Sequence, residues 1–212
     1  MKKLNEMRIE KRLTSSFRIT TMITSVAAIA AILVLLIISS RYTYALRYFG
    51  FAQGDIGQAI ILFTDARGDT RAIVGYDDQS VISSLVSQFD EDKEGFTSKW
   101  KEVEAVLVTD ETKSTYQTIN DKLQDYWALN EEIIELGKTV SDKASRQQAQ
   151  SKALNELAPA YEEIDSLMNE LLNEKTSRGE SLDNTLNITT YILVVAAVIV
   201  LVISFNISVR FG

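Results

Sequence analysis

Two arginines that stand four residues apart, Arg67 and Arg71, have the type and spacing that suggest binding chemistry. They lie in the stretch ARGDTRAIVGYDD, residues 66–78, which also contains the tripeptide Arg-Gly-Asp. On a helix this spacing places both guanidinium groups on one face, and such planar groups suit the recognition of carboxylates. Three interpretations are open: an exposed adhesion loop, a patch that binds a small molecule, or the polar end of a helix.

The composition removes much of the catalytic repertoire. Among 212 residues there is no cysteine and no histidine, so the chain has no thiolate, no imidazole base and no histidine ligand for a metal. Clusters of carboxylates remain, but a di-iron bundle would need Glu-x-x-His motifs. We therefore expect no catalytic residue, no metal, no cofactor and no enzyme activity. The carboxylate clusters are Glu131, Glu132 and Glu135, and Glu162, Glu163 and Asp165.

Two uncharged apolar runs, residues 19–40 and 188–209, predict transmembrane helices. A helix of this length spans about 33 Å, which matches a hydrocarbon core of about 30 Å. The first run is too long for the apolar region of a cleaved signal peptide.

The distribution of charge predicts the orientation in the membrane. Residues 1–18 contain six basic and two acidic side chains, and Arg210 follows the second run. By the positive-inside rule both termini are expected in the cytoplasm. Residues 41–187 contain 15 basic and 27 acidic side chains and should lie outside. This acidic surface makes nucleic acid an unsuitable partner, whereas tyrosines beside the apolar runs are expected to contact membrane lipid.

The outer segment is expected to be all-α, an up-down-up-down four-helix bundle flanked by the two transmembrane helices. Apolar residues recur in steps of three and four, and breaks fall near Gly75–Asp78, at Thr109 and around residues 140–150. Pro159 either kinks the fourth helix or lies in its first turn. The expected organisation is a basic cytoplasmic N-terminus (1–18), a first transmembrane helix (19–40), the extracytoplasmic bundle (41–187), a second transmembrane helix (188–209) and the start of a cytoplasmic region (210–212).

This layout resembles the sensor portion of bacterial methyl-accepting chemotaxis proteins of the four-helix-bundle type. The resemblance covers nearly the whole chain. It includes three local sequence segments: YALRYFGFAQGDIGQ (44–58), FTDARGDTRAIVGYDD (63–78) and NELAPAYEEID (155–165). It implies a bacterial cytoplasmic membrane protein that crosses the membrane twice. It also implies a chemotaxis receptor that detects an extracellular small molecule or a ligand-loaded binding protein and signals through the fourth helix and second span.

The resemblance further implies a homodimer with paired first helices and a ligand pocket near the distal end. Arg67 and Arg71, with Thr64 and Thr70 nearby, would bind an amino acid or another carboxylate there. Alternatively the arginines pair with neighbouring aspartates as a solvated charge cluster. A second set of residues is expected either to contact the other subunit or to pack against the fourth helix of the same subunit: Gly50, Gln53, Gly54 and Gly57.

The resemblance does not extend past the last residues, NISVRFG, where a HAMP relay domain would begin in this family. Either the chain is part of a longer receptor or it is naturally short, and cytoplasmic signalling partners would be reached only through a region beyond residue 212. Two other functions stay open: the sensor half of a histidine kinase or similar receptor, and a stand-alone membrane-tethered interaction protein.

Overall fold

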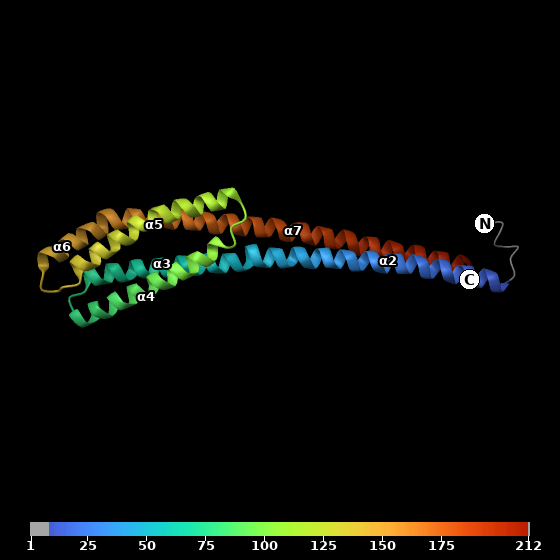
Figure 1. The fold of residues 1–212 in the computed structure, drawn as a ribbon, viewed down its shortest axis with the longest axis horizontal. Coiled ribbons are helices and arrows are strands. Elements are labelled where there is room, and N and C mark those ends of the chain that lie inside the picture. Colours follow the sequence, from blue (N-terminus) through green and yellow to red (C-terminus); the bar gives the residue numbers. More distant parts are fainter. Residues whose placement is uncertain (1–8, 212) are drawn as a thin grey trace. The chain divides into compact units, whose positions relative to one another are not determined.

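The computed structural model describes residues 9–211, and within this range every regular element is a helix (Figure 1). Part of the predicted cytoplasmic N-terminus lies outside the described residues, including Lys2, Lys3 and Arg8. The side chain of Arg210 is not described either. The helices are α2 (Ile9–Ala45), the π-helix η1 (Leu46–Gly50), α3 (Phe51–Gly75), α4 (Gln79–Glu104), α5 (Asp110–Gly137), α6 (Lys143–Lys152), the π-helix η2 (Ala153–Leu157) and α7 (Ala158–Phe211).

The chain divides into two compact units. One unit is the bundle, Leu46–Gly179, and the other combines residues 1–45 with residues 180–212. The bundle contains η1 and α3, then α4, then α5, and as its fourth helix α6, η2 and the first part of α7. Its consecutive helices run in alternating directions (Figure 1), so the prediction of an all-helical four-helix bundle is confirmed.

Side-chain caps define the turns of the bundle. α3 ends at Gly75, and the carboxylate of Asp78 accepts hydrogen bonds from the backbone N–H groups of Ser80 and Val81 at the start of α4. Thr109 caps α5 through a reciprocal capping box with Thr112. The fourth bundle helix begins at Lys143, with Asp142 as its N-cap.

Aromatic rings fill the middle of the bundle core. Phe63 of α3 is fully buried and stacks on Tyr161 of α7, with ring centroids 5.0 Å apart and planes at 9°. It also contacts the rings of Phe96, Tyr126 and Trp127. These contacts link all four helices of the bundle, because each ring comes from α3, α4, α5 or α7.

Pro159 is the second residue of α7 and directly follows the π-helix η2. A proline inside an α-helix lacks the N–H donor and its ring clashes with the carbonyl four residues earlier, here Asn155. Asn155 lies within η2, where the chain takes the wider i to i−5 spacing and the N–H of Ala158 bonds to the carbonyl of Ala153. The π-turn therefore accommodates the proline, and the fourth bundle helix continues through it without a gap.

Two helical stretches of the described chain are long and apolar enough to cross a membrane. They are residues 13–75 and 143–206, whose most apolar windows have mean hydropathies of 2.7 and 2.8. Most side chains of these windows are exposed, including Leu33, Leu36 and Val198. Such exposure of contiguous apolar surface is typical of helices that face lipid.

Candidate functional site

Arg67 joins the first and fourth helices of the bundle. Its guanidinium carbon lies 3.8 Å from the centre of the Tyr161 ring, and its Nη2 donates a 3.2 Å hydrogen bond to Oε1 of Glu162. The Arg67 side chain is 20% exposed, whereas Glu162 is 68% exposed. The guanidinium therefore lies over an aromatic ring and also donates to a carboxylate, so it combines a cation–π contact with a charge-assisted hydrogen bond.

Thr64 belongs to the same cluster. Its hydroxyl lies 2.9 Å from the hydroxyl of Tyr161 and 2.8 Å from the carbonyl oxygen of Ile60. The Tyr161 hydroxyl is also 3.4 Å from the carboxylate of Asp165. Thr64, Arg67, Tyr161 and Glu162 thus form one polar cluster on the α3–α7 face, which we call the Arg67 cluster.

The other two residues of the predicted ligand set lie elsewhere. Thr70 is fully buried, and its hydroxyl bonds to the side-chain oxygen of Asn130 at 2.8 Å. Arg71 is exposed. The helix brings Thr64 and Arg67 together and directs Thr70 into the core and Arg71 towards solvent, because successive residues rotate by about 100°.

The Arg-Gly-Asp tripeptide lies inside α3, eight residues or fewer from its end at Gly75. It is not an exposed loop, so the adhesion-loop interpretation lacks the structure that it would need. Asp69 is partly buried, with its Oδ2 atom shielded from solvent. Burial, followed by the nearby charges of Asp92 and Asp65, raises the pKa of Asp69 to about 6.

The four residues predicted for either dimer contact or packing within the subunit differ in their surroundings within the chain. A Cβ at Gly54 or Gly57 would meet nothing within 4 Å, and Gly54 is exposed. The amide of Gln53 lies 3.3 Å from the position of a Cβ at Gly179 in α7. Gly50, at the end of η1, is exposed. Gln53 therefore packs against the fourth helix of its own chain, while Gly54 leaves an open position on the surface of α3.

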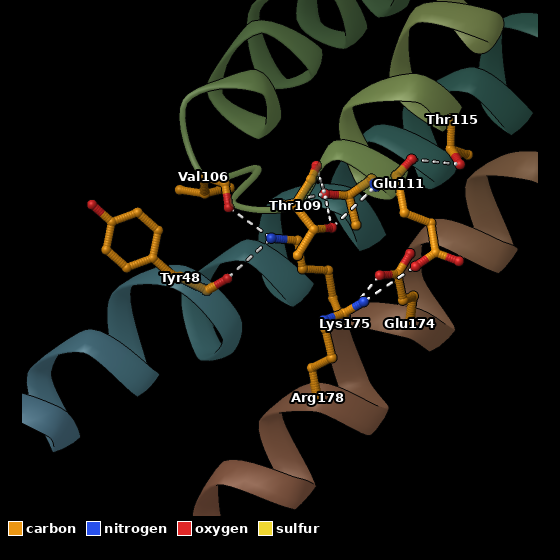
Figure 2. Close-up of polar contacts among 9 residues, drawn as sticks. Tyr48, Val106, Thr109, Glu111, Thr115, Glu174, Lys175 and Arg178 are labelled. Carbon is orange, nitrogen blue, oxygen red and sulfur yellow. Dashed lines mark hydrogen bonds and ion pairs between the residues drawn. The ribbon is translucent and has the colours of Figure 1, made fainter.

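Lys175 is a buried cation that the sequence analysis did not identify. Its side chain is fully buried, and its Nζ donates hydrogen bonds to the carbonyl oxygens of Val106 at 2.6 Å and Tyr48 at 3.4 Å (Figure 2). The signal was present in the periodicity, because Lys175 occupies the seam position between Leu171 and Leu182 of the fourth helix.

Arg146 of α6 is a second buried cation that sequence reasoning missed. Its guanidinium donates to the carbonyl oxygens of Gly137 at 2.6 Å and Tyr76 at 2.5 Å, and more distantly to those of Ile73 and Val74. These carbonyls end α3 and α5, whose last turns have no helical donors. Arg146 therefore closes the end of the bundle where α3 and α5 terminate.

The carboxylate clusters pair with cations. Glu131 pairs with Lys93, Glu132 with Lys152, and Glu163 with Lys122. In the part of the chain that the structure describes, no group of three or more acidic side chains is placed to hold a metal ion.

Comparison with known proteins identifies the module. A family model described as a four helix bundle sensory module for signal transduction matches residues 6–188. No curated protein and no solved structure matches the chain.

Proposed function

The chain belongs to the family of four-helix-bundle sensory modules of methyl-accepting chemotaxis proteins, and on this premise we propose that it is the sensor of a two-pass membrane receptor. In this proposal the bundle lies outside the cytoplasmic membrane and detects a small molecule or a ligand-loaded binding protein. The chain acts as a receptor rather than an enzyme, and its output is chemotaxis signal transduction. Both termini lie in the cytoplasm, as the basic residues 1–18 favour.

The observation that carries the proposal is the continuity of α7. This single helix of 54 residues contains Tyr161 and Glu162, which contact Arg67, and also the apolar run 188–209. A helix transmits an axial displacement along its length, and shifts of about 1–2 Å are typical of signalling helices. A ligand that changes the contacts of Tyr161 and Glu162 would therefore act directly on the segment that crosses the membrane.

The Arg67 cluster supports a ligand with a carboxylate group, such as an amino acid. Glu162 pairs with Arg67 through a single hydrogen bond, and the Glu162 side chain is largely exposed. An exposed ion pair of this kind contributes at most about 1 kcal/mol to stability. A ligand carboxylate can replace it without a large cost. Arg71, four residues further along α3, supplies a second guanidinium, which is exposed to solvent. We leave Thr70 out of the proposed site because it is bonded inside the core.

A second copy of the chain is the proposed partner of α3. Exposed residues recur on this helix at heptad spacing, and two of them, Phe51 and Ile61, are 66% and 59% exposed. Between and beyond them, Gly54 and Gly68 have open space where a side chain would stand. Glycines on an exposed helix face allow close approach of a second backbone. We therefore assign the homodimer contact to this exposed face of α3 and not to Gln53, which packs against α7.

The ligand is tested by thermal unfolding of the full chain in detergent micelles against a panel of amino acids and small carboxylates. A binding ligand at a hundredfold excess over its dissociation constant adds about 2.7 kcal/mol to the free energy of unfolding. The resulting shift should vanish in Arg67→Ala and Arg71→Ala, and persist in Lys122→Ala, which removes an ion pair with Glu163 elsewhere on the bundle. A shift that survives both arginine substitutions would contradict the proposed site.

The dimer is tested with single cysteines, which the cysteine-free chain makes simple. Under mild oxidation, Ile61→Cys should give a disulfide-linked dimer in membranes. Ser87→Cys on α4, at another exposed position, is the control and should stay monomeric. Equal crosslinking at both positions would argue against α3 as the dimer face.

A further inference from the structure

We propose that Lys175 is a positioning residue that ties α7 to the α4–α5 turn and to the π-helix η1, so that displacement of α7 changes the geometry of η1. The inference rests on the proposed function in one respect: it takes α7 as the helix that carries the signal. The geometry itself involves only residues of the bundle unit, Leu46–Gly179.

The ammonium group bridges three segments of the chain. Figure 2 shows Lys175 reaching from α7 to the carbonyl of Val106, just after α4, and to the carbonyl of Tyr48 in η1. The ring of Phe49, also in η1, has its centroid 5.4 Å from Nζ. An ammonium has three donors and no acceptor, so the two carbonyls and the ring face supply the surroundings that a buried cation needs.

These surroundings contain no paired carboxylate. Lys175 takes part in none of the ion pairs among the described side chains, and the adjacent Glu174 pairs with Arg178, which also reaches Glu111. Burial accordingly lowers the pKa of Lys175. A buried charge is costly to desolvate, and an apolar residue would fill the same seam position without that cost. Buried polar groups in helical seams are best attested as devices that fix register.

The carbonyl of Val106 is a suitable anchor because it lies just after the C-terminal end of α4. The last turn closes with hydrogen bonds between residues three apart, from the N–H of Val106 to the carbonyl of Val103 and from the N–H of Leu107 to the carbonyl of Glu104. Carbonyls at a helix C-terminus lack helical donors and attract cations. Lys175 therefore holds α7 against a fixed backbone position rather than against a mobile side chain.

η1 is the element that can respond to a shift of α7. A π-turn accommodates one more residue than an α-turn and is often found at functional sites. α7 also approaches η1 closely one turn beyond Lys175, because a Cβ at Gly179 would lie 3.3 Å from Cβ of Phe49. A shift of α7 must therefore move the Lys175 contacts or Phe49. Either change releases η1 towards α-helical geometry and alters the rotational register of the residues before it.

Amide hydrogen exchange of the full chain in detergent micelles tests the proposal, with Lys175→Met as the first variant. Methionine keeps most of the volume and removes the donors. Exchange over residues 46–51 and 106–109 should become at least tenfold faster, while exchange in the middle of α5 should change less than twofold. Arg178→Met is the matched control, because it removes the ion pairs beside Lys175 but leaves the bridge; it should leave residues 46–51 within twofold.

A second variant keeps the test informative if Lys175→Met does not fold. Gly179→Ala retains the lysine but pushes α7 away from Phe49, and it should accelerate exchange over residues 46–51 at least threefold. Unchanged exchange in this range in every variant that folds, or an equal increase throughout α5, would overturn the proposal. No ligand is involved, so this result is independent of the ligand test of the proposed function.

Discussion

Thr70 of α3 and Asn130 of α5 share a hydrogen bond of 2.8 Å inside the bundle, and both side chains are fully buried. The amide of Asn130 also donates to the carbonyl of Tyr126 at 2.8 Å, which orients its oxygen towards Thr70. The pair is a polar layer within an apolar core. It fixes the relative position of α3 and α5 because either side chain alone would be a buried polar group without its partner.

Thr70→Val should lower the free energy of unfolding by about 1–3 kcal/mol, because it preserves shape but leaves the oxygen of Asn130 unpaired. The double substitution Thr70→Val with Asn130→Leu should cost less than the sum of the two single changes. Denaturant unfolding of the full chain in micelles, followed by circular dichroism, measures this coupling. Strict additivity would mean that the two side chains do not act as a pair.

Asp69 should make the bundle sensitive to pH. Its pKa is raised from 3.8 to about 6, first by burial and then by the charges of Asp92 and Asp65. The folded state therefore holds the proton more tightly than the unfolded chain, and this contribution to stability is present below about pH 4 and lost as the pH rises to about 6.

Asp69→Asn should accordingly raise the free energy of unfolding at pH 7 by about 1 kcal/mol, a value discounted for the partial exposure of the group. At pH 4 the variant and the parent should be nearly equal. Thermal unfolding at the two pH values tests this, and Asp121→Asn, on an exposed position of α5, is the control. A stability gain that is the same at both pH values would contradict the assigned titration.

Arg146→Met should destabilise the end of the bundle at which α3 and α5 terminate. The substitution leaves the carbonyls of Gly137 and Tyr76 without their charged donor, and each such hydrogen bond contributes about 1.5–3 kcal/mol. Faster hydrogen exchange should appear around residues 73–78 and 137–140. Lys152→Met, which removes only surface ion pairs with Glu132 and Glu156, should change stability by less than about 1 kcal/mol.

Two glycines should respond oppositely to alanine. A Cβ at Gly137 would lie 2.9 Å from Cγ1 of Val74, so Gly137→Ala should overpack the α3–α5 contact and cost about 1–3 kcal/mol. A Cβ at Gly68 would meet nothing within 4 Å, so Gly68→Ala should stabilise the isolated subunit by about 1 kcal/mol through helix propensity. Thermal unfolding at low protein concentration compares them. If Gly68 lies in the dimer contact, its alanine variant should also dimerise more weakly.

The bundle itself could be predicted from the sequence, because heptad spacing, the breaks near Gly75–Asp78 and at Thr109, and the scarcity of helix breakers are local properties. The family was likewise correctly identified from the order of the apolar and helical segments and from local sequence motifs. The two apolar runs could also be recognised from the sequence, because a length of 22 uncharged residues is a local property that does not depend on tertiary contacts.

Only the tertiary structure decided how the individual polar residues are used. The spacing of Thr64, Arg67, Thr70 and Arg71 placed them on a common part of α3, but their roles depend on which helix packs against each one. Arg67 contacts Tyr161 and Glu162, whereas Thr70 donates a hydrogen bond to Asn130. The same holds for Lys175, whose partners Val106 and Tyr48 are 69 and 127 residues away. Local patterns determine helices, but contacts between distant residues arise only when those helices pack. The sequence therefore specified the helices of the bundle, and packing determined the partners of each polar side chain.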